Sequence, residues 1–324
     1  MKEHAVELTC SVYGMGSCRY RAIYSSSIAT PFFPSVVRVG SRSSELAMIQ
    51  TRTIVAALQK LYPSIKFEIT TMKTIGDNIL DKPLPNIGQT NLFTKELEVA
   101  LAAKEVDMIV HSLKDLPTTL PPGMTVSVIY KRDNPTDALV LHPKHNGLQI
   151  QTLPKGSVIG TSSLRRIAQL KRNFPDLEFK TVRGNLNTRL KKLDQSGEYD
   201  ALVLATAGLE RMGWQERISQ ELDKTVCMYA VGQGAMAVET RSDDAPMNQL
   251  LLPLNDPDTL LCCVAERAFL HDLGGGCSVP VGTYSAVQNG SLEMEGAVFS
   301  LSGSEVVKDS VVVPLPENHA LYYG

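Results

Sequence analysis

Short apolar runs alternate with longer amphipathic stretches along most of the chain. The apolar runs at 36–40, 67–72 and 106–112 predict strands. The stretches at 44–62 and 93–105 have apolar residues at helical spacing and predict helices. Strands interleaved with helices are typical of α/β folds with largely parallel sheets, so we expect this fold class.

The same plan recurs in the middle of the chain. A strand and turn are expected over 157–163, strands over 178–184 and 199–209, and helices over 164–174 and 185–194. Two strand-to-helix junctions also echo each other, VGSRSSELA and IGTSSLRRIA. Each has an apolar strand end, then glycine, hydroxyl residues, arginine and a helix. We therefore expect two similar domains that face each other across a cleft.

A third unit is expected near residue 256. Asp256 is a favourable helix N-cap, Pro257 suits the first helical position, and apolar stripes continue to about residue 273. The segments 291–299 and 304–313 predict strands of a small sheet joined by the turn SLSGS. The expected domains are 35–132 plus 232–254, 133–231 and 255–324.

Two further stretches carry no regular pattern. Residues 1–34 lack a continuous apolar segment, so a secretory signal is not expected. Basic and hydroxyl residues suggest an organelle transit peptide, but Glu3 and Glu7 argue against it, and we favour a disordered leader. The segment 76–91 is rich in Gly, Pro and Asn and predicts a long mobile loop of functional importance.

Composition and charge narrow the function classes. A chain of 324 residues with 43% hydrophobic residues and a net charge of −2 is an ordinary globular protein and a poor candidate for nucleic-acid binding. No apolar run reaches membrane-spanning length. The six cysteines include no CxxC pair, which argues against zinc and a disulfide framework. We therefore expect no metal and a reducing, cytoplasmic setting.

Arginines gather at the strand-to-helix junctions. Arg42, Arg165 and Arg166 fall near the first turns of expected helices, whose free N–H groups favour anions. A solvated surface arginine is the alternative for any one of them. Further cations at such junctions are Arg183, Arg189 and Arg211. Guanidinium groups bind carboxylates or phosphates through two hydrogen bonds, so the pattern predicts a small polyanionic ligand.

The segment VHSLKDLP places Ser112, Lys114 and Asp115 just after a predicted parallel strand, where α/β proteins bind ligands. Asp115 could hold a cationic group or transfer protons, and an ion pair with Lys114 is the alternative. His111, inside the apolar strand, is interpreted as structural. The glycine-rich stretch 231–237 lacks nucleotide-loop spacing and predicts a turn or crossing strand between domains.

Cys277 follows glycines in LGGGCSVPVG, so another group could approach its sulfur closely. No local signature supplies the histidine that a cysteine protease needs. The remaining interpretation is a covalent tether for a group that lies in the cleft.

These segments together resemble the hydroxymethylbilane synthase family, also called porphobilinogen deaminases, and the animal-type members most closely. The resemblance runs from about residue 36 to about residue 313. Its motifs, in chain order, include VGSRSSELA, VDMIVHSLKDLPT, GTSSLRRIAQL, RGNLNTRLKKLD, LVLATAGLERMGW, YAVGQGAMAVE and GGCSVPVG.

The resemblance implies a transferase of haem biosynthesis that joins four porphobilinogen molecules into hydroxymethylbilane. It implies a dipyrromethane cofactor bound to Cys277 by a thioether, Asp115 as the catalytic carboxylate, and 76–91 as a mobile active-site loop. The implied cofactor-binding residues are Lys114, Ser112, Arg165, Arg166, Thr161, Ser162, Ser163, Arg189, Gly184 and Asn185. The implied substrate-binding residues are Arg42, Ser44, Arg183 and Arg211.

The resemblance also implies two domains similar to type II periplasmic binding proteins, and we expect a monomer. Gly274 replaces a glutamate that is common in the family. The family's third domain continues to a terminal helix, so we expect a shortened, destabilised third domain with exposed apolar surface. A small-anion-binding protein and an inactive truncated synthase are the alternatives, and a simple binding protein would need neither Cys277 nor Asp115.

Overall fold

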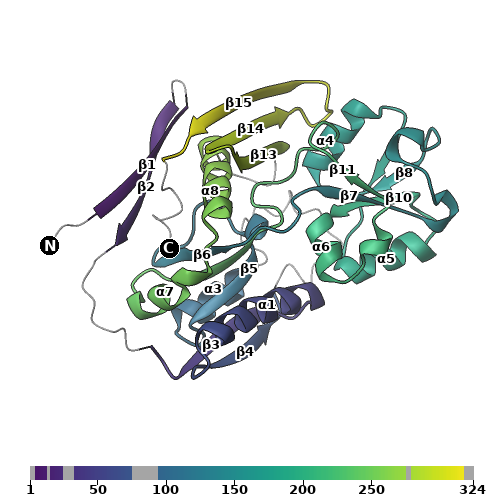
Figure 1. The fold of residues 1–324 in the computed structure, drawn as a ribbon. Helices are drawn as coiled ribbons and strands as arrows, with labels where there is room; N and C mark the ends of the chain where they lie inside the picture. The colour runs from purple at the N-terminus through teal and green to yellow at the C-terminus, as the bar shows by residue number, and fades with distance from the viewer. Residues whose placement is uncertain (1–3, 13–14, 25–32, 75–93, 275–278, 317–324) are drawn as a thin grey trace.

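The computed structural model describes residues 4–12, 15–24, 33–74, 94–274 and 279–316 (Figure 1). Two five-stranded sheets with their helices lie side by side, and a three-stranded sheet lies above them in this view. Cys277 and the segment 76–91 lie outside the described residues. No described helix is long and apolar enough to cross a membrane.

Domain 1 is built on a sheet with the strand order β4-β3-β5-β12-β6. Its first three strands are parallel, and β12 runs antiparallel to both β5 and β6. The strands are β3 (Val36–Arg42), β4 (Lys66–Met72), β5 (Met108–Ser112), β6 (Met124–Tyr130) and β12 (Met236–Arg241). The helices are α1 (Glu45–Leu61), α3 (Lys95–Ala102) and α7 (Ala245–Leu251).

The core of domain 1 is formed by alternate residues of its strands and by one face of its helices. Alternate residues of β3, Val37 and Val39, are fully buried, and so are Ile54 and Leu58, one turn apart on α1. Each such side chain contributes about 1.5–3 kcal/mol when it leaves water. The packing holds the start of α1 beside the carboxyl end of β3.

Domain 2 repeats this plan with the strand order β11-β7-β10-β8-β9. Strands β8, β9 and β10 are parallel, whereas β7 runs antiparallel to β10 and β11. The strands are β7 (Asp137–Leu141), β8 (Val158–Gly160), β9 (Glu178–Lys180), β10 (Ala201–Ala205) and β11 (Gln220–Leu222). The helices are α4 (Leu164–Asn173), α5 (Leu186–Gln195) and α6 (Thr206–Arg211). The expected α/β class with two similar domains is confirmed.

Two predicted strands of domain 2 are wrong in their extent. The strand expected over 178–184 ends at Lys180 as β9. A strand was expected over 199–209, but β10 ends at Ala205 and α6 begins at Thr206. The apolar run continues because the first turn of α6 is buried as well, so hydrophobicity alone could not mark the change. Gly208 of this turn faces Leu186 and Leu46 from the two domains.

Two crossing segments, 131–136 and 223–235, join the domains. The N–H of Asp133 donates to the carbonyl of Gly234 at 3.2 Å. Gly234 has a φ of +87°, and a Cβ there would lie 2.6 Å from the carbonyl oxygen of Asp133. Only glycine permits this approach. The prediction of a turn or crossing strand over 231–237 is confirmed, because a turn at 231–234 leads into β12.

The third unit combines α8 (Pro257–Asp272) with an antiparallel sheet in the order β13-β14-β15. The strands are β13 (Val281–Gln288), β14 (Ser291–Phe299) and β15 (Val306–Pro314). The Asp256 carboxylate accepts from the Thr259 N–H at 2.9 Å, as the sequence predicted for a cap. Gly296 lets the Phe269 ring pack on the sheet, because a Cβ would lie 2.5 Å from it.

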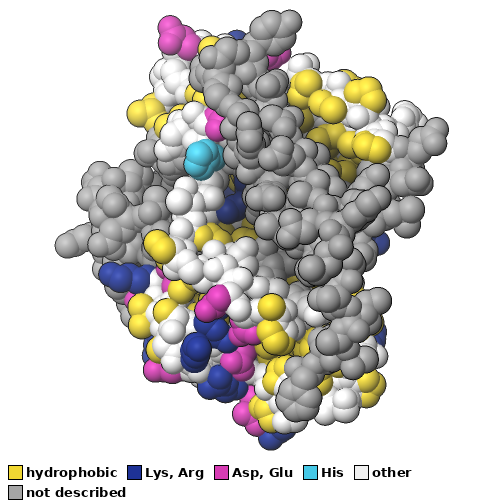
Figure 2. All heavy atoms as spheres, turned by 90° about the vertical axis from the view of Figure 1, so that its left-hand side faces the viewer, with side chains coloured by type: hydrophobic (Ala, Val, Ile, Leu, Met, Phe, Trp, Pro, Cys, Tyr) yellow, Lys and Arg dark blue, Asp and Glu magenta, His cyan; other side chains and the backbone are white. Residues whose placement is uncertain are grey.

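Strand β15 exposes several apolar side chains at the sheet edge, and Val307 is 76% exposed. On the face shown in Figure 2, hydrophobic side chains gather near the top, at the height of this sheet, while acidic and basic ones intermix below. Exposed apolar surface in this unit was expected. The hairpin of β1 (His4–Val12) and β2 (Met15–Tyr24) was not expected from residues 1–34.

Candidate active site

The candidate site lies where the carboxyl ends of strands from both domains meet the crossing segments. From domain 1, β5 ends at Ser112 and leads into a short turn that carries Lys114 and Asp115. The Lys114 ammonium donates to the side-chain oxygen of Gln233, which lies on a crossing segment, at 3.4 Å. Asp115 is exposed, Lys114 is half-buried, and Gln233 is buried.

Asp137 lies at the centre of the part of the site that domain 2 contributes, and the sequence did not predict it. Its carboxylate is fully buried and accepts from Arg165 at 2.7 Å and from Arg166 at 2.6 Å. The amide of Gln233 donates to the same carboxylate at 2.9 Å, and the Cys227 thiol lies 3.4 Å away. Burial alone would raise the pKa of Asp137, but the two guanidinium groups outweigh it and hold the pKa below its ordinary range.

Arg165 and Arg166 are both buried, so they are not solvated surface arginines. Each also donates to a backbone carbonyl, Arg165 to Met228 and Arg166 to Val203. The Nε of Arg166 is buried without a hydrogen-bond partner among the described residues. A buried donor without an acceptor is costly, so this position favours a bound acceptor.

Cations outnumber carboxylates around this point. Burial lowers the pKa of Lys114 to about 8, and the nearby charges of Arg165 and Arg166 lower it as well, against the opposing effect of Asp115 and Asp137. Burial also lowers the pKa of Arg189 to about 10, with Arg166 the next cause. Among the described residues, Lys114, Arg165, Arg166 and Arg189, with Arg183 near Arg189, face the two carboxylates of Asp115 and Asp137. This leaves a local positive excess that an anion would relieve.

The hydroxyl and glycine positions of domain 2 shape the two strand-to-helix turns. Ser162 donates to the carbonyl of Val182 at 2.7 Å, and the Thr161 hydroxyl accepts from the N–H of Ser163 at 3.2 Å. Ser163 in turn caps α4. These hydroxyls hold Arg165 and Arg166 at the first turn of α4.

The second turn leads into α5. Asn185 caps this helix by accepting from the Thr188 N–H at 2.9 Å. Gly184 has a φ of +110°, which favours glycine, and its carbonyl accepts from Arg189 at 2.9 Å. Arg183 lies near enough to Arg189 for its charge to lower the pKa of Arg189, so it adds to the positive charge of the site.

Arg211 does not join the cation cluster, because its guanidinium donates to Asp133 at 2.8 Å and to the Gly234 carbonyl at 2.6 Å and so ties the crossing segments together. Arg42 ends β3 and Ser44 precedes α1, both half-buried at the carboxyl edge of the domain 1 sheet. The Ser112 hydroxyl accepts from the Gln50 amide at 2.8 Å.

Other chemical groups near the site are structural. His111 lies 2.9 Å from the buried Glu239 carboxylate, in agreement with a structural interpretation. Burial raises the pKa of the Cys227 thiol to about 12, so it stays protonated and unreactive at neutral pH. Among the residues that the structure describes, no cluster of His, Cys, Asp or Glu could hold a metal ion.

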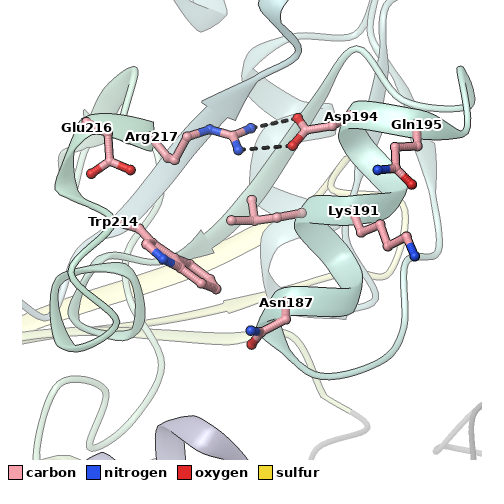
Figure 3. A pocket seen from close by; sticks show the side chains of 8 residues that line it. Asn187, Lys191, Asp194, Gln195, Trp214, Glu216 and Arg217 are labelled. Atoms are coloured by element: carbon pink, nitrogen blue, oxygen red, sulfur yellow. Dashed lines mark hydrogen bonds and ion pairs between the residues drawn. The ribbon is translucent and has the colours of Figure 1, made fainter.

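A separate shallow pocket of about 360 Å³ lies on domain 2 (Figure 3). Trp214, Leu190 and Lys191 line it, beside the paired side chains of Arg217 and Asp194. None of the predicted site residues lines this pocket, and we assign it no role.

The comparisons with known proteins converge on one family. Residues 37–249 match "Porphobilinogen deaminase, dipyromethane cofactor binding domain", and residues 260–321 match "Porphobilinogen deaminase, C-terminal domain". The chain is 51% identical over 294 residues to a porphobilinogen deaminase of Synechococcus elongatus, with 91% of each chain covered. It is 52% identical over 275 residues to that of a Nostoc species, with 85% of each covered.

A porphobilinogen deaminase of Gloeobacter violaceus is 50% identical over 274 residues, 84% of this chain and 83% of that one. These relatives are bacterial, whereas the sequence suggested an animal-type member. Among solved structures, the periplasmic VFT2 domain of Bordetella pertussis BvgS is 16% identical. It covers 74% of this chain and 92% of that chain with a TM-score of 0.40.

Proposed function

The chain belongs to the porphobilinogen deaminase family, and from this premise we propose that it joins four porphobilinogen molecules head to tail into hydroxymethylbilane. The reaction releases ammonia at each addition, and the product grows on a dipyrromethane group attached to Cys277 by a thioether. The match over 37–249 to a dipyrromethane-binding domain supports this cofactor.

The observation that carries the proposal is the buried positive excess between the domains. Porphobilinogen bears one acetate and one propionate, so dipyrromethane and the growing product are polycarboxylates. Lys114, Arg165, Arg166 and Arg189 offer more positive charge than the nearby carboxylates balance, and the buried Nε of Arg166 has no acceptor within the described part of the chain. These residues therefore fit dipyrromethane, which would supply the pyrrole carbon that attacks each new substrate.

Asp115 is the catalytic carboxylate in this proposal. It is exposed at the edge of the cation cluster, close enough for its charge to raise the pKa of Lys114 and of Arg189. Its negative charge would stabilise the positive charge that develops on the substrate's pyrrole nitrogen as ammonia leaves. Such electrostatic stabilisation in a preorganised site is a large contribution to catalysis.

The substrate carboxylates would be held by Arg42, Ser44 and Arg183, which lie at the carboxyl edges of the two sheets. Arg211 would act on the substrate only indirectly, through the crossing segments that it ties together. The domain boundaries, the monomeric state and the cytoplasmic setting stay predictions, which limited proteolysis, gel filtration and cell fractionation can check.

Intact mass spectrometry tests the proposal most directly. Purified protein should exceed its sequence mass by one dipyrromethane and should convert porphobilinogen. Cys277→Ser should lose both properties, whereas Cys262→Ala should keep the adduct, because Cys262 is a buried thiol of α8. An active protein without the adduct would contradict the proposal. An unmodified protein that binds porphobilinogen without turnover would favour the anion-binding alternative.

A further inference from the structure

The buried carboxylate of Asp137, on β7, joins groups from two other parts of the chain. It accepts one terminal N–H from each of Arg165 and Arg166 on α4. Its Oδ1 also accepts from the Gln233 amide on a crossing segment. Two buried guanidinium groups side by side would repel each other, so a shared carboxylate is what permits both to stay charged at this position.

Gln233 continues this connection to domain 1. Its amide nitrogen donates to Asp137 at 2.9 Å and to the carbonyl of Pro135 at 2.7 Å, which fixes the orientation of the amide. Its amide oxygen therefore points the other way and accepts from the Lys114 ammonium at 3.4 Å. The residue is 1% exposed, so water cannot readily replace either contact.

We propose that Asp137 and Gln233 are positioning residues, which fix the guanidinium groups of Arg165 and Arg166 and the ammonium of Lys114 in one arrangement for binding a polycarboxylate. Because this inference rests on the proposed function, it concerns how the same site holds the carboxylates of dipyrromethane and its extensions. Asp137 balances only one of the two arginine charges. The remaining charge stays available to the ligand, and so does the Nε of Arg166, which has no partner among the residues described.

The arrangement has a consequence for Lys114 that a purely structural role would not produce. Among the residues that the structure describes, the charged groups that act most on its ammonium are Asp115, Arg166, Asp137 and Arg165. Of these four, Asp115 and Asp137 favour the protonated ammonium. Removal of the Asp137 charge should lower the pKa of Lys114 below its present value of about 8, so that Lys114 loses its proton closer to neutral pH.

Two variants of the full chain test this inference. Asp137→Asn keeps the side-chain shape but removes the charge, and Gln233→Leu breaks the link to Lys114 while leaving the arginine–Asp137 bonds in place. Each should raise the KM for porphobilinogen by at least about tenfold, with a smaller change in kcat. For Asp137→Asn, the basic limb of the kcat/KM profile should move down by about one pH unit.

A second measurement does not depend on activity. Acetylation of Lys114 by a limiting amount of acetic anhydride, followed across about pH 6 to 10 by peptide mass, reports the pKa of its ammonium directly. Both variants should shift this titration to lower pH. Asp194→Asn is the matched control, because it removes a carboxylate from a bidentate arginine pair of the same domain that is away from the site.

The outcomes are distinct. A folded Asp137→Asn protein with unchanged KM and unchanged Lys114 titration would overturn the inference. If Asp137→Asn does not fold, an unchanged KM and titration in Gln233→Leu would overturn it. If the wild-type protein carries no dipyrromethane, the proposed function fails, and the Lys114 titration alone then decides whether Asp137 and Gln233 position this cation.

Discussion

Replacement of Glu266 by glutamine should destabilise the protein strongly, although the two side chains have the same shape. Glu266 of α8 is fully buried and accepts from the Arg132 guanidinium at 2.7 and 3.1 Å. It also accepts from the N–H of Gly232 at 2.7 Å. One carboxylate therefore fastens α8 to both crossing segments.

The expected loss of stability follows from the charge of Arg132, which would lose its counter-ion. Burial works to lower the pKa of Arg132, but Glu266 outweighs it and holds the pKa above its ordinary value. Glutamine would leave the Arg132 charge buried without its counter-ion, which costs about 3–5 kcal/mol. At about 2–4 °C per kcal/mol for a unit of this size, the melting temperature should fall by at least about 6 °C.

Scanning calorimetry of Glu266→Gln, Arg132→Gln and the double variant is the assay. The double variant should be less destabilised than the sum of the two single changes, because it leaves no unpaired charge. Asp194→Asn is the control, since its arginine pair is about a third exposed and should contribute less than about 1 kcal/mol. The reasoning would be refuted if Glu266→Gln melted at the same temperature as the control. It would also be refuted if the destabilisation of the double variant equalled the sum of the two single effects.

Two further predictions concern catalysis and the contact of the third unit with α4. Asp115→Asn should lower kcat by roughly 100-fold or more with an unchanged melting temperature, because the carboxylate is exposed and acts on developing charge; near-normal turnover would instead assign Asp115 to an ion pair. Gly303→Ala should lower the melting temperature, because its Cβ would lie 2.2 Å from the Ala168 carbonyl oxygen on α4 and Gly303 has a φ of +79°. Gly290→Ala, which has a similar φ but open space around it, separates the clash from the backbone strain.

The amphipathic elements could be predicted from the sequence because their information is local. The helix expected over 44–62 is α1 at Glu45–Leu61, and the cap at Asp256 lies where the sequence indicates. The run at 199–209 failed because the strand and the next helix are both buried, and burial removes the periodicity that distinguishes them.

The site was only partly predictable for a different reason. Arginine-rich junctions and a strand-end aspartate indicated an anionic ligand, but the partner of Arg165 and Arg166 lies 28 and 29 positions away in the chain. Asp137 is an acidic residue directly before the buried run ALVL, and this is the one local signal that could have identified it. The role of Arg211 depends on the contact between two crossing segments, which no local pattern records.

The position of β12 has a consequence for synthesis on the ribosome. This strand lies between β5 and β6 in the domain 1 sheet, but it follows all of domain 2 in the chain (Figure 1). Domain 2 can therefore complete its sheet while domain 1 still lacks an internal strand. Until β12 is synthesised, β5 and β6 each have an unpaired edge. Such edges are prone to aggregation. Chaperones that act during translation should therefore bind mainly to the first half of the chain, which contains β5 and β6, rather than to the second half.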